Sequence, residues 1–106
     1  MKIFESQVEE LKGTIEIPEF LTLPQVIAYN AAAREAKGVT DPYEKTSIFL
    51  PVILDLTGKW NVAGVPEHPT LETMPMTPIL PALRLVQLVH NEIIKLIIGE
   101  TSIPNA

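Results

Sequence analysis

The chain contains no cysteine and only two histidines, and these shortages exclude several kinds of chemistry. Without cysteine there can be no disulfide and no thiolate metal site, which fits an intracellular protein. His68 and His90 form no His-x-x-x-His pair, and no acidic calcium-binding loop is present. We therefore expect neither a metal nor another cofactor.

Positive charge is also scarce. Eight Lys and Arg are scattered along the chain against thirteen Asp and Glu, which gives an acidic protein of net charge −5. Binding to nucleic acid generally requires a basic footprint, so we expect no nucleic-acid partner. The first residues, MKIFESQVEELKG, carry acids where a signal peptide would need an apolar centre. We accordingly predict a cytoplasmic protein.

Features of a catalytic site are missing as well. The five glycines are isolated, so no glycine-rich loop is available to hold a phosphate. Ser6, Ser47 and Ser102 do not lie in the strand-turn-helix setting of a nucleophile elbow. Asp41 and Asp55 look like a helix cap and a helix-end acid rather than a catalytic pair. We expect a protein without enzymatic activity and predict no catalytic residue.

Apolar residues, in contrast, are abundant. They make up 46% of 106 residues, a length that predicts one domain covering residues 1–106. The segment Gly13–Pro18 alternates as a half-buried strand does, with Ile15 and Ile17 on one face. A single strand needs a neighbour, so we expect it to pair with Ile3–Phe4 or with another chain. This is the short β element predicted near the N-terminus.

Two helices are predicted in the next part of the chain. Thr22 and Gln25 have the spacing of a capping box, and the helix that they begin should run from Leu23 to Lys37 and stop at Gly38. The second helix should begin with Asp41 as its cap and end at Gly58.

Pro51 lies inside the apolar pattern of the second helix. It removes one helical hydrogen bond and crowds the preceding turn, so we expect a kink or a break near residues 49–50.

Residues 58–77 have a different composition, with three prolines and two glycines. We predict a long loop without regular structure, which in a compact domain is typically functional or mobile. Trp60, Val62 and Val65 are candidates to hold its first half on the core. Met74 and Met76 are flexible apolar side chains that suit an adaptable contact.

The last predicted helix begins with Thr77 as its cap and ends at Ile98. Its polar residues recur at intervals of three and four and form one narrow stripe, made of Arg84, Gln87, Asn91 and Lys95. The charges of Arg84, Glu92 and Lys95 exclude a membrane span, because each costs roughly 2.5–3.5 kcal/mol at the centre of a bilayer. Either this is the central helix of a monomer, or another chain covers it, and we favour the second interpretation. The predicted fold is mainly α, with three to four helices.

Several segments together resemble a known family. They are GTIEIPEFLTLPQVIAYNAA, the proline-containing helix after it, GKWNVAGVPE and the ending IIGETSIPNA. Over roughly residues 13–105 this chain is similar to the small tail assembly chaperones of long-tailed, siphovirus-like bacteriophages and prophages. The resemblance implies a non-enzymatic protein that self-associates, coats the tape measure protein before the tail tube polymerises, and is absent from the finished tail. In some members a longer frameshifted form contacts the tail tube protein.

The resemblance supplies no active-site residues, so the predicted contacts come from the excess of apolar side chains. We predict a homo-oligomer that also binds the tape measure protein, in the cytoplasm of an infected or lysogenic bacterial host. The candidate contact residues are Leu85, Val89, Ile93 and Leu96 of the last helix and Met74 and Met76 of the loop. Two alternatives stay open: a tail-completion or head-to-tail connector protein retained in the virion, and a module that binds a small apolar ligand.

Overall fold

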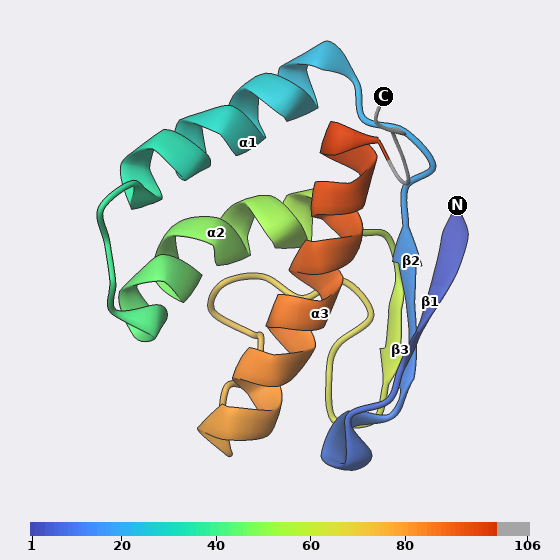
Figure 1. Cartoon of the computed structure of the whole chain (residues 1–106). Helices are drawn as coiled ribbons and strands as arrows, with labels where there is room; N and C mark the ends of the chain where they lie inside the picture. Colours follow the sequence, from blue (N-terminus) through green and yellow to red (C-terminus); the bar gives the residue numbers. More distant parts are fainter. Residues whose placement is uncertain (100–106) are drawn as a thin grey trace.

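The computed structural model describes residues 1–99, which form three α-helices and one three-stranded antiparallel sheet (Figure 1). In chain order the elements are β1 (Lys2–Ser6), the 3-10 turn η1 (Glu9–Leu11), β2 (Gly13–Ile17), α1 (Leu23–Ala36), α2 (Pro42–Leu56), β3 (Trp60–Val62) and α3 (Ile79–Ile98). The predicted mainly helical class is confirmed at this level. The end of the chain, residues 100–106, lies outside the described residues.

The sheet has the order β1-β2-β3, with β2 in the middle. Phe4 of β1 lies opposite Ile15 of β2, which confirms the predicted pairing of the N-terminal strands. Ile15 and Ile17 are both fully buried, as their alternation indicated. At the other edge Gly13 pairs with Val62, and its φ of +150° and the nearby Asn61 carbonyl leave no room for a Cβ atom.

The prediction that residues 58–77 lack regular structure is wrong at Trp60–Val62, which form strand β3. Trp60 and Val62 face the interior while Asn61 between them is exposed, so even three residues show the alternation of a strand. The indole N–H of Trp60 donates to Oγ1 of Thr57 at 2.9 Å, so burial of this large ring leaves no orphaned donor. Prediction failed here because three residues between glycines give too short a pattern.

The beginnings of α1 and α2 agree with their sequence signals. The side-chain oxygen of Gln25 accepts the backbone N–H of Thr22 at 2.8 Å, which is the returning half of the capping box. Asp41 accepts the N–H of Tyr43 at 3.1 Å. Gly38 follows α1 with a φ of +85°, the conformation for which glycine is favoured after a helix.

Helix α2 runs through Pro51 as one element, so of the expected kink or break the break does not occur. Pro51 is exposed. Ser47, whose carbonyl loses its partner at position 51, is exposed as well, so water can satisfy that carbonyl.

The start of α3 differs from the prediction by one residue. Pro78, rather than Thr77, occupies the cap position, and no side chain caps the helix. The reason is the extended backbone of Pro78, with ψ at 141°, which delays the first helical residue to Ile79. The polar stripe on α3 is confirmed, because its four members are all exposed.

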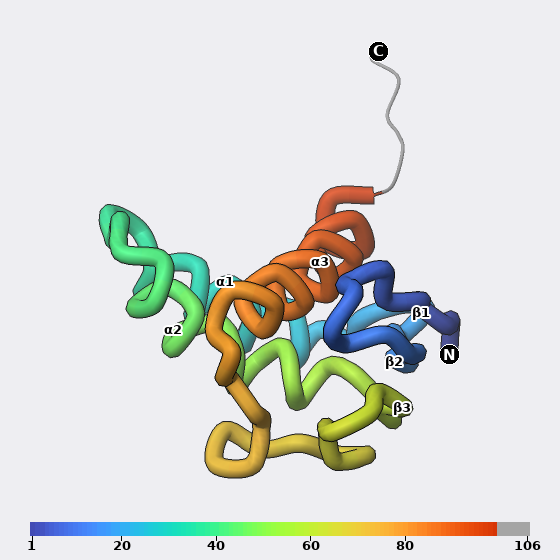
Figure 2. Tube along the Cα trace, turned by 90° about the horizontal axis from the view of Figure 1, so that it is seen from below, coloured from blue at the N-terminus to red at the C-terminus, as the bar shows by residue number. Residues whose placement is uncertain are grey.

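The interior lies where α3 and α2 cover one face of the sheet. Leu85, Val89 and Ile93 of α3 are fully buried in one cluster with the inward side chains of the sheet and with Leu50, Ile53 and Leu56 of α2. Figure 2 shows α3 running between the α1–α2 pair and the sheet. The favoured interpretation, that another chain covers this side of α3, is therefore corrected: the sheet and α2 of the same chain do so.

Candidate functional site

The side chains that would have to carry catalysis are dispersed and serve local structure. Ser6 is buried, and its Oγ accepts the Val8 N–H at 3.2 Å. Ser47 donates to the Glu44 carbonyl within α2 at 2.8 Å, and Ser102 lies outside the described residues. Among residues 1–99, no group of three or more His, Cys, Asp or Glu is placed to hold a metal ion.

The six predicted contact residues lie mainly in the interior. Leu85, Val89 and Ile93 are 0% exposed and Met74 is 6% exposed, so these four are core residues, and the prediction that they form an open contact surface is corrected. Leu96 and Met76 are half-buried and pack against the same core. The physical reason is that the sheet of the same chain covers these side chains, whereas the helical pattern alone indicated that a partner chain would cover them. A contact surface has to be sought elsewhere.

A groove of about 900 Å³ opens to solvent between α1, α2 and α3. Its floor is apolar and is made of Ala33 and Ala36 from α1, Phe49 and Ile53 from α2, and Leu83 and Val86 from α3. Ala36, Ile53 and Val86 are buried, so the accessible apolar surface of the floor belongs mainly to Ala33, Phe49 and Leu83. The two alanines explain the depth of the groove, because larger side chains at these positions of α1 would fill the space. In Figure 1 the α1–α2 pair extends to one side of α3 and ends in the turn between the two helices.

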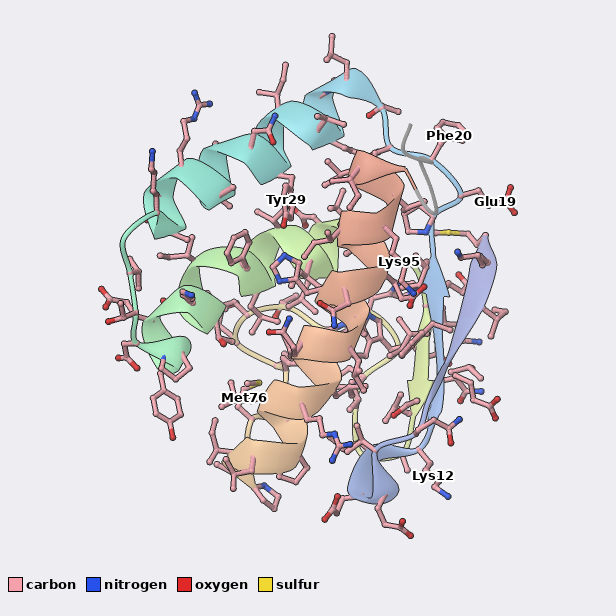
Figure 3. All side chains as sticks on the ribbon, viewed as in Figure 1. Lys12, Glu19, Phe20, Tyr29, Met76 and Lys95 are labelled. Carbon is pink, nitrogen blue, oxygen red and sulfur yellow. The ribbon has the colours of Figure 1, made fainter. Side chains whose placement is uncertain are left out.

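Three ring side chains, one from each helix, meet beside the floor of the groove. The hydroxyl of Tyr29 lies 2.7 Å from Nε2 of His90. The ring of Phe49 lies 4.5 Å from that of His90 and 5.6 Å from that of Tyr29, measured between centroids. Figure 3 shows Tyr29 reaching from α1 toward the other two helices. These contacts fix the walls of the groove relative to one another.

Burial keeps this polar pair neutral. It lowers the pKa of His90 below the ordinary value of 6.5 and raises the pKa of Tyr29 above its ordinary value of 10.0. At neutral pH the imidazole is therefore uncharged and the phenol is protonated. Neither His90 nor Tyr29 therefore contributes charge to the groove at neutral pH.

The charge of the groove comes from cations at one end. Arg34 and Lys37 of α1 and Lys45 of α2 line it near the α1–α2 turn, and none of the lining residues is Asp or Glu. The other polar lining residues are Asn30, Thr40, Thr46 and Gln87. The groove thus combines an apolar floor with a positive end, in a chain whose net charge is −5.

A second surface lies at the N-terminal end of α1, whereas the groove is lined by residues of its C-terminal half and by Lys37 just after it. Phe20, Leu23 and Ile27 are 74%, 71% and 55% exposed, and we call these three residues the outer face of α1. Leu23 and Ile27 are four apart and so share one side of the helix. Figure 3 shows Phe20, just before the helix, pointing away from the body of the molecule. Large apolar side chains gathered in this way are typical of a contact site.

Sequence reasoning missed both surfaces. Three of the eight Lys and Arg lie within residues 34–45. Glu35, Asp41 and Glu44 lie in the same segment and balance their charge in the sequence, so the positive cluster is not apparent there. Ala33 and Ala36 carry no signal of a groove in the sequence. That they border an open groove depends on where α3 crosses the other two helices.

No family model, curated protein sequence or solved structure matches this chain. Over residues 1–99, no helix combines the length and the apolar character that crossing a bilayer would need. Function is therefore inferred from the two surfaces and from the resemblance in sequence.

Proposed function

We propose that this protein is a non-enzymatic chaperone of phage tail assembly, and that its groove holds an amphipathic helix of the tape measure protein. The observation that carries the proposal is the open apolar floor where three helices meet. A helix placed there would pack against α1, α2 and α3 at once. The resemblance to tail assembly chaperones supports the same partner.

Binding would follow the helix-in-groove mode, in which apolar side chains at positions i, i+3, i+4 and i+7 of the client enter the groove. Each Leu or Ile that leaves water contributes roughly 1.5–3 kcal/mol, so two or three anchors offset the loss of freedom on binding. Phe49 of α2 and Leu83 of α3 are the largest half-buried apolar side chains in the lining, and the client would pack against them. No bond is made or broken.

The client and the site of action follow from the resemblance. The resemblance implies a long helical client that is coated before the tail tube polymerises around it, and the chain would cover apolar stripes of its helices in the cytoplasm of the infected or lysogenic host. A weak, reversible contact suits a protein that must leave as the tube grows. The tail tube protein would be a partner only of a longer, frameshifted form.

Self-association belongs to the same proposal, and we assign it to the outer face of α1. Phe20, Leu23 and Ile27 are exposed, while the apolar side chains of α3 other than Leu80 and Ile98 are buried or half-buried. Because this surface lies at the N-terminal end of α1 and the groove is lined from Asn30 onward, copies of the chain could associate and still leave their grooves open. An array of this kind would cover a long client.

The test is co-expression of the chain with a tagged tape measure protein, followed by affinity capture. Ala33→Trp should abolish capture, because Ala33 lines the groove and a large ring would fill it. Ala31→Trp is the matched control, since Ala31 is exposed on the same helix and does not line the groove. Equal capture of both variants would contradict the groove as the client site.

Two other outcomes would replace the proposal. If mass spectrometry of purified virions finds the chain, it is a tail-completion or connector protein rather than a chaperone. The volume of the groove also falls within the range of small-molecule sites, roughly 300–1,000 Å³, which favours an apolar ligand as the second candidate. Native mass spectrometry that detects a retained lipid, lost in Ala33→Trp, would support that candidate.

A further inference from the structure

The side chains that line the groove carry a net positive charge. Arg34, Lys37 and Lys45 line it without an acidic neighbour in the lining. Within residues 1–99 the ion pairs lie elsewhere, between the N-terminal amine and Glu19, Lys59 and Glu67, and Lys95 and Glu92. The three cations of the groove are therefore free to meet charges on a bound molecule.

The nearest acids in sequence do not cancel this charge at the groove. Glu35, Asp41 and Glu44 are exposed and lie outside the lining. Asp41 is moreover engaged as the cap of α2, where it accepts the Tyr43 N–H. The acids and the cations are all exposed and screened alike by salt, but only the cations line the groove, where a bound ligand would face them directly.

The cations also have a definite position. They gather at the α1–α2 turn, which Figures 1 and 2 place at the end of the helical pair away from α3. Toward α3 the lining is apolar or uncharged, with Leu83, Val86 and Gln87. The groove is therefore polarised along its length, positive at the turn and apolar at α3.

From this polarity we propose that the groove selects an acidic amphipathic helix and fixes its direction. This inference rests on the proposed function and adds the chemistry of the client. Asp or Glu side chains beside the apolar stripe lie at the α1–α2 turn against Arg34, Lys37 and Lys45, and the apolar anchors continue toward α3. The thirteen Asp and Glu of the chain give the rest of its surface a net negative charge, which repels such a helix and steers it to the groove.

The experiment measures binding of three synthetic helical peptides to the full chain by fluorescence anisotropy. They share one apolar i, i+3, i+4, i+7 pattern and carry Glu, Gln or Lys beside it at one end. The Glu peptide should bind about tenfold more tightly than the Gln peptide at 50 mM salt, as expected for three exposed charge pairs, and the Lys peptide should bind least. At 500 mM salt the advantage should fall below about threefold, because exposed pairs are screened.

Charge-reversed variants locate the effect. R34E/K37E/K45E should reverse the order of the peptides. K2E/K12E/R84E changes the net charge equally at exposed positions outside the groove and should leave the order unchanged. Circular dichroism confirms that each variant is folded before binding is compared.

The possible results separate the inference from the function on which it rests. Equal binding of all three peptides, abolished by Ala33→Trp, would overturn the acidic client and leave the helix-binding groove intact. Failure of every peptide to bind would overturn both. Dodecanoate offers a carboxylate on an apolar chain without a helix, and if it bound to the groove while no peptide did, the occupant would be a small amphiphile and the inference would be wrong.

Discussion

The hydroxyl of Tyr29 on α1 lies 2.7 Å from Nε2 of His90 on α3, across 61 positions of sequence. Both rings also contact Phe49 of α2, so one polar contact and its aromatic neighbour join the three helices that surround the groove. Neither residue stands in a recognisable motif.

Removing this hydroxyl should weaken the fold. Tyr29→Phe leaves Nε2 of His90 without its protein partner at a half-buried position, which should lower the free energy of unfolding by about 0.5–1.5 kcal/mol. Urea denaturation followed by circular dichroism measures the change. Tyr43→Phe is the control, because Tyr43 is 54% exposed and its substitution should have almost no effect. Equal midpoints for the two variants would show that the Tyr29 contact contributes nothing.

Stability should also depend on pH through His90. Burial lowers the pKa of His90 in the folded state below 6.5, so the unfolded chain takes up a proton more readily. Its contribution is therefore fully present above pH 6.5 and is lost as the pH falls through 6.5 toward the lower folded value. Thermal unfolding between pH 7.5 and pH 5 should show this loss in the wild type and in His68→Gln, but not in His90→Gln. A pH profile that His90→Gln leaves unaltered would assign the dependence to another group.

The two sides of α3 should respond very differently to the same substitution. Leu85 is 0% exposed, so Leu85→Ala should cost about 2–5 kcal/mol in the free energy of unfolding, as large-to-small changes in a core do. Leu80 on the same helix is 72% exposed, and Leu80→Ala should change it by less than about 0.5 kcal/mol. Chemical denaturation of both variants makes the comparison. A small cost at Leu85 would contradict its burial in the core of the single chain.

Self-association should depend on the outer face of α1. The variant F20S/L23Q/I27Q removes three exposed apolar side chains and should reduce the mass measured by light scattering to the 11.7 kDa of one chain. L71Q/L80Q removes exposed leucines elsewhere and should keep the mass of the wild type. A wild-type protein that is already monomeric at high micromolar concentration would exclude self-association.

Local signals predicted most of the helical structure correctly. The capping residues Thr22, Gln25 and Asp41 and the terminal Gly38 define their helix ends through contacts within a few residues, so the sequence around them suffices. At Pro51 the expected break does not occur, because the apolar residues on both sides of it, Leu50 and Ile53, pack into one core and keep α2 continuous.

The candidate site was predicted less well, because its parts come from distant segments. Arg34, Lys37 and Lys45 belong to one short stretch, yet the groove that they line exists only where α3 crosses α1 and α2. The predicted contact residues of α3 were correctly recognised as apolar, but their pattern could not name the surface that covers them.

The sequence by itself determined the polar stripe on α3, the alternating strand β2, the helix ends and the acidic charge, since each follows from neighbouring residues and their periodicity. Only the tertiary structure decided that Leu85, Val89 and Ile93 are buried by the sheet and α2 of the same chain. The same packing left a groove with a positive end and turned Phe20, Leu23 and Ile27 outward. Whether a side chain is buried depends on which surfaces pack together, and residues far apart in sequence come into contact only in the folded chain.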